Sequence, residues 1–409
     1  MNKIFLSTFF VFYAVSSFAQ AINVYDLGLN CIKQNHYLKA IDTIKVLKKK
    51  YDESHTSDAG NLSTSSYDQA INLFSSFIGE DYPYKFNDDN SLLKNHKVSF
   101  TPAIPYIINL AKGRRVVMIN ENHYIPKHRI LTYNLLQQFY DIGYRYLALE
   151  ALTPGDTISL KRDKSSIYAN EPNMANLIRE ALRLGFQLIA YESEDNTPEN
   201  PNFSSHRRNM RELLQARNLY QIIVKDPQAK ILVHAGVAHI WEQATTNKGM
   251  YMAEYFKVIS GIDPLTINQS VLHDEEFTAR LDRSLALKST GMPFVVLDSL
   301  NLPDVSEADR KGNYDLLVAW PTPENRFGRS DYMLQKTGTK INMIDLKESD
   351  AGNLLQVFKY EDDNGIPVDQ FRITAGVKRG ATALPSGKYQ IQLVNNNGKI
   401  LWKRLVTIP

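Results

Sequence analysis

Short apolar runs alternate with amphipathic helical segments from residue 99 to 311, and this alternation restricts the fold more than any other feature of the chain. The apolar runs are nearly continuous, which is typical of strands buried on both faces and joined by helical crossovers. We therefore expect residues 99–311 to form an α/β domain with a mostly parallel sheet and flanking helices. The predicted strands are RVVMIN, YRYLALE, FQLIAYE, KILVHAG and PFVVLD.

Residues 20–98 predict a helical segment. Apolar residues recur at helical spacing from Tyr25 to Leu47, with a polar break at Gln34-Asn35-His36. The pattern resembles one tetratricopeptide-like helix pair, and a Ser/Asp/Asn-rich passage separates it from another short helix. Because one such pair cannot close a core alone, we expect it to pack on the rest of the chain.

The last region, residues 312–409, changes to a period-2 pattern. GKYQIQLVNNNGKILWKRLVTI combines alternating apolar residues with an Asn-Asn-Gly turn, which predicts a hairpin. No long helical pattern occurs there. We expect a small β-sandwich-like C-terminal domain.

The first residues predict export. Residues 1–19 contain a lysine, an apolar stretch and the small-x-small triplet Ser17-Phe18-Ala19, the pattern of a signal peptide. The single cysteine, Cys31, supports neither a lipid anchor at the cleavage site nor a disulfide framework. No later apolar run is long enough for a membrane span. We expect a periplasmic or extracellular protein.

Composition excludes one large class of partners. The 409 residues carry a formal net charge of +3, with Lys and Arg spread along the chain, so no basic patch predicts nucleic-acid binding. The 43% of hydrophobic residues are sufficient for a sizeable core. We expect a small-molecule substrate, and the sequence does not determine the oligomeric state.

The predicted strands end in chemically active residues. In a parallel sheet all carboxyl ends lie along one edge, where ligands bind in open α/β folds. These residues are therefore expected to converge there: Glu121 and His123 after the first strand, Glu150 after the second, Glu192 after the third, His239 after the fourth and Asp298 at the fifth.

The first strand end offers two kinds of chemistry. Glu121 and His123 are two residues apart, so in an extended chain their side chains point to the same side. Pro126 suits the first turn of a helix, which would place a neutral His128 nearby. A carboxylate and an imidazole can activate water as a general base. Alternatively, His123, His128 and a carboxylate could hold a divalent metal. His234, within an apolar strand, is more typical of a hydrogen-bonded core histidine.

Four motifs in the order of the chain carry a resemblance. INENHYIPKHRILTYNLLQQFYDIGYRYLALEAL resembles the opening of the superfamily that groups erythromycin-esterase-like proteins, haem-uptake ChaN-like proteins and Tiki proteases. Their Glu-x-His and second-strand Glu match Glu121, His123 and Glu150. RELLQARNL matches their Arg-Glu helix motif at Arg211 and Glu212, and KILVHAGVAHIWE matches their Gly-x-x-His at His239. The resemblance covers residues 100–260 and implies an α/β core of that type.

The resemblance implies a hydrolase that attacks an ester or amide bond with activated water. It assigns His123 as general base, Glu121 or Glu150 as its orienting carboxylate, and His239 as oxyanion stabiliser or acid. The chain departs from the family pattern at Asn120, usually Gly, at Tyr124, usually Gly or Asp, and at Gln215, where the family has Met before Ala. We expect substrate contacts from His128, Tyr124, Glu192 and Arg211. No Gly-x-Ser-x-Gly elbow occurs, which disfavours a serine nucleophile.

Three alternatives stay open. A ChaN-like protein would bind haem or a metal for uptake, with Tyr124 as an axial ligand. A Tiki-like peptidase would use His123 or His128 with a carboxylate as metal ligands. A non-catalytic interaction protein would retain only a vestigial site. The cofactor accordingly remains open between none, a divalent metal and haem.

Overall fold

The computed structural model describes most of the chain. The described residues are 23–54, 66–81, 99–153, 155, 158–192, 204–243, 249–270, 292–297, 300, 302–303, 313–321, 323–362 and 364–409. The predicted signal peptide and Asp298 lie outside them. Within them, no helix is both long enough and apolar enough to cross a membrane.

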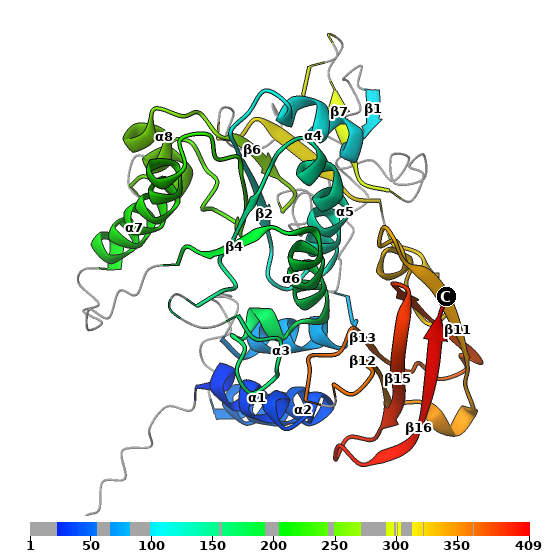
Figure 1. The fold of residues 1–409 in the computed structure, drawn as a ribbon. Coiled ribbons are helices and arrows are strands. Elements are labelled where there is room, and N and C mark those ends of the chain that lie inside the picture. The colour runs from blue at the N-terminus through cyan, green and yellow to red at the C-terminus, as the bar shows by residue number, and fades with distance from the viewer. Residues whose placement is uncertain are drawn as a thin grey trace, which may run out of the picture.

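A mixed α/β architecture is built around an eight-stranded, mostly parallel sheet (Figure 1). Its strand order is β1-β7-β8-β6-β2-β5-β3-β4. The strands are β1 Ser99–Pro102, β2 Val116–Glu121, β3 Tyr146–Leu149, β4 Gln187–Ala190, β5 Ile231–Gly236, β6 Leu265–Asn268, β7 Phe294–Leu297 and β8 Leu316–Ala319. β2, β3, β4 and β5 are parallel neighbours, so their carboxyl ends meet at one edge.

Two features of this sheet differ from the sequence-based prediction. β7, the fifth predicted strand, is antiparallel to both β1 and β8, so its carboxyl end lies at the edge opposite the other four. Asp298, which was expected at the same edge as the other strand ends, lies outside the described residues. In addition, β8 lies beyond residue 311, so the sheet extends past the predicted domain boundary.

Helices cover both faces of the sheet. One face carries α4 (Ala103–Ala111), α5 (Lys127–Asp141) and α6 (Pro172–Leu184), and the other carries α7 (Ser204–Lys225) and α8 (Met252–Ser260). In β2, Val117 and Ile119 pack on the first face, while Val116 and Met118 pack on the second. The nearly continuous apolar sequence of β2 follows from this two-sided burial.

The N-terminal helices pack on the C-terminal region. They are α1 (Val24–Lys33), α2 (Tyr37–Ser54) and α3 (Ser66–Phe77), and the predicted break falls between α1 and α2. Their core includes Leu354 and Val394 of the C-terminal strands. Asn35, with a φ of 64°, exchanges two hydrogen bonds with the amide of Gln356, at 3.0 and 2.8 Å. The first and last regions of the chain therefore form one packed unit (Figure 1).

The C-terminal region contains small antiparallel sheets that share one hydrophobic core. A two-stranded sheet pairs β11 (Lys340–Asp345) with β14 (Arg379–Leu384). A four-stranded sheet has the order β13-β12-β15-β16, with β12 Leu354–Lys359, β13 Asp369–Arg372, β15 Gly387–Val394 and β16 Ile400–Ile408. β15 and β16 form the hairpin that the Asn-Asn-Gly turn predicts. A short pair, β9 (Asn325–Arg326) and β10 (Arg329–Ser330), precedes them.

Candidate active site

A cleft of about 610 Å³ opens at the shared carboxyl edge of β2, β5, β3 and β4. Residues from all four strand ends contribute to it. Its polar or ionisable lining side chains are His123, Glu150, Thr153, Ser166, Tyr168, Glu192, Arg211 and His239. The structure therefore brings together five of the residues singled out from the sequence: His123, Glu150, Glu192, Arg211 and His239.

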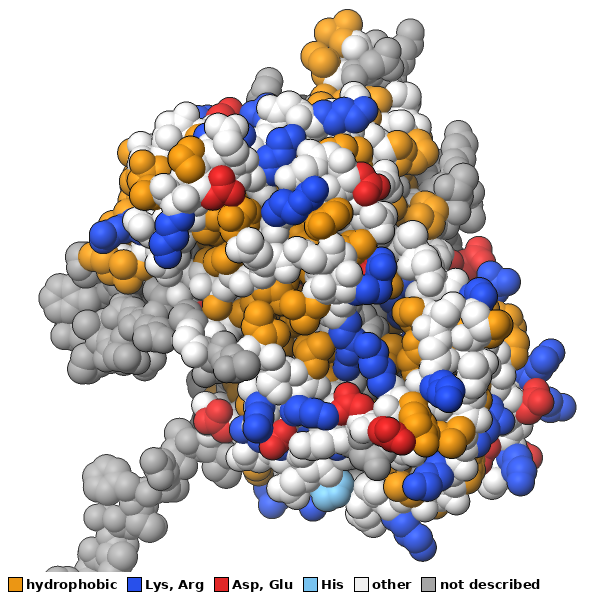
Figure 2. Space-filling model, in the orientation of Figure 1, with side chains coloured by type: hydrophobic (Ala, Val, Ile, Leu, Met, Phe, Trp, Pro, Cys, Tyr) orange, Lys and Arg blue, Asp and Glu red, His pale blue; other side chains and the backbone are white. Residues whose placement is uncertain are grey.

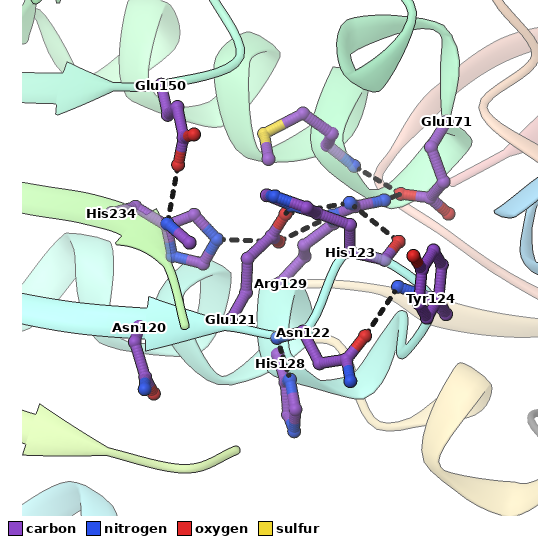
Figure 3. Close-up of polar contacts among 12 residues, drawn as sticks. Asn120, Glu121, Asn122, His123, Tyr124, His128, Arg129, Glu150, Glu171 and His234 are labelled. Atoms are coloured by element: carbon purple, nitrogen blue, oxygen red, sulfur yellow. Dashed lines mark hydrogen bonds and ion pairs between the residues drawn. The ribbon is translucent and has the colours of Figure 1, made fainter. Parts of the chain in front are cut away.

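Glu121 is the centre of a buried hydrogen-bond network behind the cleft (Figure 3). Its Oε1 lies 2.7 Å from His123 Nδ1 and accepts a 2.8 Å bond from Arg129. Its Oε2 accepts a 2.7 Å bond from Arg129 Nε and lies 2.8 Å from His234 Nε2. Four contacts thus fix one carboxylate. Arg129 also contacts Glu171 at 3.0 Å, so its guanidinium joins two buried acids.

The network keeps Glu121 ionised. Burial by itself would raise the pKa of this carboxyl, but the charge of Arg129 and hydrogen bonds from His123, His234 and Arg129 hold the pKa well below its usual range. An ionised carboxylate at Nδ1 selects the His123 tautomer that has its proton on that nitrogen. His123 Nε2 is then the nitrogen that can accept a proton.

The ring of His123 is held on its face as well as at its edge. It stacks on Tyr168 with the ring centroids 4.2 Å apart and the planes 25° apart. Tyr168 belongs to the short 3₁₀ helix Tyr168–Asn170, which leads into α6. Gly236 is also close to the ring: a Cβ built on it would lie 3.1 Å from His123 Nε2 and 2.9 Å from Glu150 Oε2. Only glycine leaves both groups their places, which explains its position at the end of β5.

Glu150 lies between the two cleft histidines. Its Oε2 accepts a 2.6 Å bond from the backbone N–H of Gly236, and its Oε1 accepts a 2.8 Å bond from Arg211. Arg211 also binds Glu192 through two nitrogens, and so it ties the ends of β3 and β4 together. Burial would raise the pKa of Glu150, but the charges of His239, His123 and Arg211 outweigh it and hold the pKa well below its usual range.

His239 is placed between two carboxylates. Its Nδ1 lies 2.8 Å from Glu212 Oε2, and its Nε2 lies 3.4 Å from Glu150 Oε1. Burial would lower the pKa of His239, but Glu150 and Glu212 outweigh this effect and raise the pKa to about 10. Glu212 also accepts a 2.9 Å bond from the backbone N–H of Met252 at the start of α8. His239 is therefore a cation at neutral pH, while Glu121 gives His123 the geometry of a base.

His128 is a correction to the sequence-based site. Its ring is fully buried and turned away from the Glu121 side chain, and its Nδ1 accepts a 2.9 Å bond from the backbone N–H of Asn122 (Figure 3). Burial, reinforced by the charge of Lys127, holds the pKa of His128 well below its usual range. The neutral state predicted for it agrees with this direction. Its expected role as a substrate or metal ligand beside His123 was wrong, because the two rings point to different places.

Tyr124 is the second correction. It packs with the core of the N-terminal helices and does not line the cleft. Its backbone N–H donates a 3.0 Å bond to the Asn122 side chain, which turns the chain away from the strand (Figure 3). The ring therefore lies outside the position required of a substrate contact or an axial haem ligand in this cleft.

The donor set does not fit a metal centre. Within the described part of the chain, no group of three or more His, Cys, Asp or Glu side chains is arranged to hold a metal ion. The Nδ1 atoms of His123 and His239 are each engaged by a carboxylate of the protein. The predicted pair of His123 and His128 is not formed, so we derive no catalytic step through a metal.

Sequence reasoning missed several members of the network, among them Arg129, Glu171 and the contact of His234 with Glu121. Arg129 is the residue after His128, at the start of the helix that follows the first strand. A cation at that position was the sequence signal for a partner of Glu121.

Asn120, the departure from the family's glycine, also has a role. Its side chain donates to Val237 O at 2.9 Å and accepts from the backbone N–H of Gln269 at 2.8 Å. It joins the β5 and β6 loops beneath the cleft.

No protein-family model matches the chain, and no curated protein matches it. Among solved structures, it is similar to the type III effector HopBA1, with 13% identity, a TM-score of 0.35, and coverage of 55% of this chain and 96% of that one. It is also similar to RRSP, a MARTX toxin effector domain from Vibrio vulnificus, with 13% identity, a TM-score of 0.33, and coverage of 63% and 56%. Similarities at this level support no inference about activity.

Proposed function

We propose that this protein is a hydrolase in which His123 activates water to attack an ester or amide carbonyl. One observation carries the proposal. His123 and His239 each have Nδ1 bound to a carboxylate of the protein, and both line one cleft with Glu150 beside them. One imidazole is thus built as a base and the other is held as a cation, which is the division of roles that acyl transfer to water requires.

The reaction follows from these roles. His123 Nε2 removes a proton from water as the oxygen bonds to the carbonyl carbon, and Glu121 stabilises the imidazolium that forms. The oxyanion of the tetrahedral intermediate is stabilised by the positive charge of His239. When the intermediate collapses, the bond from carbon to the leaving group breaks and the leaving group takes a proton from His239. His123 then returns the water proton to solvent, through which His239 is reprotonated, and the products are an acid and an alcohol or amine.

The proposal extends to family and location. The residues that the erythromycin-esterase-like and ChaN-like resemblance assigns to catalysis, Glu121, His123, Glu150 and His239, are neighbours in one site. This clustering supports membership of that superfamily. The signal-peptide pattern of residues 1–19 supports export, so the substrate would be met in the periplasm or outside the cell.

A panel of aryl and alkyl esters and anilides, incubated with the full chain, tests the proposal. We expect hydrolysis that falls by about 10²–10⁴ in kcat/KM on His123→Asn, because general-base catalysis contributes that much. Glu121→Gln should cause a comparable loss of activity. His36→Asn, in the connection between α1 and α2 and outside the cleft lining, is the matched control and should retain activity.

A parallel reaction with chelator distinguishes water activation by His123 from a metal-dependent mechanism. Activity that survives chelation supports the water-activating mechanism through His123, whereas activity lost with chelator and restored by metal would replace it with a metal-dependent one. If folded wild-type protein hydrolyses nothing in the panel, or if His123→Asn is as active as wild type, the proposal fails.

A further inference from the structure

A second cavity, of about 390 Å³, lies between the α/β region and the C-terminal strands. It shares no lining residue with the candidate active-site cleft. Its lining comes from α5, α6 and the segments around β12 and β15. Figure 2 shows Lys and Arg side chains gathered around a hollow to the right of centre, between these two parts of the molecule. Volumes of this size are typical of small-molecule sites.

The lining contains an excess of positive charge. Arg179, Lys336, Lys359 and Lys388 line the cavity together with Arg183 and Glu180. Glu180 is already bound by Arg183 through two bonds, of 2.8 and 2.6 Å. It therefore leaves the other four cations uncompensated.

The nearby carboxylates are engaged elsewhere. Asp362 pairs with Lys161, Asp369 with Arg329, and Glu171 with Arg129. In the described part of the chain, the four cations consequently have no carboxylate partner of their own.

Two of these cations are bound by neutral oxygens of the protein. Arg179 donates to the side chain of Asn176 at 2.9 Å and to Ile366 O at 2.5 Å. Lys336, which is 6% exposed, donates to Met333 O at 3.1 Å. These bonds fix the direction of the charged groups without neutralising them, which is the arrangement expected of a preformed anion site.

The electrostatics agree with this geometry. Burial lowers the pKa of Arg179 to about 10 and also lowers the pKa of Lys336. Burial and the charge of Arg179 lower the pKa of Lys359. A bound anion would stabilise the charged forms of these buried groups.

We propose that the cavity between α6 and β15 binds a small molecule with at least two anionic groups, held by Arg179, Lys336, Lys359 and Lys388. Phosphate and carboxylate groups share the required chemistry. The rings of Tyr133, Tyr360 and Tyr389 also line the cavity and would cover an organic part of the ligand. This site is independent of the proposed hydrolase function.

Isothermal titration of the full chain with pyrophosphate and with citrate, at about 0.15 M salt, tests the proposal. We expect at least one of the two to bind, and the stronger ligand identifies the preferred anionic group. In Lys359→Gln/Lys388→Gln, two exposed residues are changed, and affinity should fall about tenfold or more because charge-assisted contacts are lost. Lys336→Met should weaken binding further.

Lys403→Gln, an exposed change on β16 outside the cavity lining, is the matched control and should bind as wild type does. The proposal is overturned if neither probe binds wild type at about 1 mM. It is also overturned if the Lys359/Lys388 double variant binds as tightly as Lys403→Gln, because binding would then be non-specific surface attraction.

Discussion

His239 and Glu212 are joined by a 2.8 Å contact between Nδ1 and Oε2, although they come from a loop after β5 and from helix α7. Against the effect of burial, Glu150 and Glu212 together raise the pKa of His239 to about 10. Glu212→Gln should therefore lower the pKa of His239 and move the alkaline limb of the pH–rate profile to lower pH. The imidazole resonances of His239, followed by NMR against pH, measure the change without any substrate.

Glu53→Gln is the control for that experiment, since Glu53 lies on the exposed end of α2. It should leave the His239 titration where it is in wild type. An unchanged titration in folded Glu212→Gln protein would mean that Glu212 does not hold the histidine charged.

Folding stability should depend on His239 at alkaline pH. Its pKa rises from about 6.5 in the unfolded chain to about 10 in the fold. Its contribution is therefore complete below about pH 6.5 and is lost as pH rises through about 10. The difference in the free energy of unfolding between wild type and His239→Gln, measured with urea at a series of pH values, should shrink across that interval. A constant difference would contradict the raised pKa.

Gly236→Ala should reduce activity more than stability. The added Cβ would lie 2.9 Å from Glu150 Oε2 and 3.1 Å from His123 Nε2, so the carboxylate and the imidazole must both shift. A displacement of this kind at the reacting groups can cost about 10² in rate. Gly113→Ala is the matched control, because its Cβ would meet nothing within 4 Å. Comparison of kcat/KM and melting temperature for the two variants decides the matter, and equal activities would refute the predicted crowding.

Arg129→Met should strongly destabilise the fold. It would leave Glu121 and Glu171, both buried, without their shared cation. Breaking a buried ion pair by removing one partner costs about 3–5 kcal/mol. Arg183→Met, which removes a surface pair with Glu180, should cost no more than about 1 kcal/mol. Urea unfolding of both variants gives the comparison. Similar losses of unfolding free energy would show that the Arg129 guanidinium does not stabilise the two buried acids as described.

The contact of Asn35 with Gln356 should stabilise the packing of the N-terminal helices on the C-terminal sheet. Its amide exchanges bonds of 3.0 and 2.8 Å with Gln356, and its φ of 64° is unfavourable for alanine. Asn35→Ala should thus lose about 2 kcal/mol of unfolding free energy. Asn35→Gly removes the same hydrogen bonds but tolerates the backbone angle, so it should lose less. If alanine is no worse than glycine in thermal unfolding, the strain argument is wrong.

The sequence predicts most of the local elements of this protein. The break at residues 34–36, the C-terminal hairpin and the four strands that carry the site all follow from side-chain periodicity and turn residues. Glu121 ends its strand, Glu150 and His239 follow theirs closely in sequence, and parallel neighbours bring such ends to one edge. Most of the cleft therefore follows from the sequence and this rule alone.

Only the tertiary structure decided the direction of β7 and the hydrogen-bond partners of the site residues. β7 became antiparallel because it pairs with β1 and β8, which periodicity does not reveal. His128 and His123 are five residues apart, yet one faces the interior and the other the cleft. The contacts of Glu121 with Arg129 and of His239 with Glu212 depend on how helices dock on the sheet. Sequence spacing fixes which residues are near along one element, whereas pairing between elements depends on packing of the whole core.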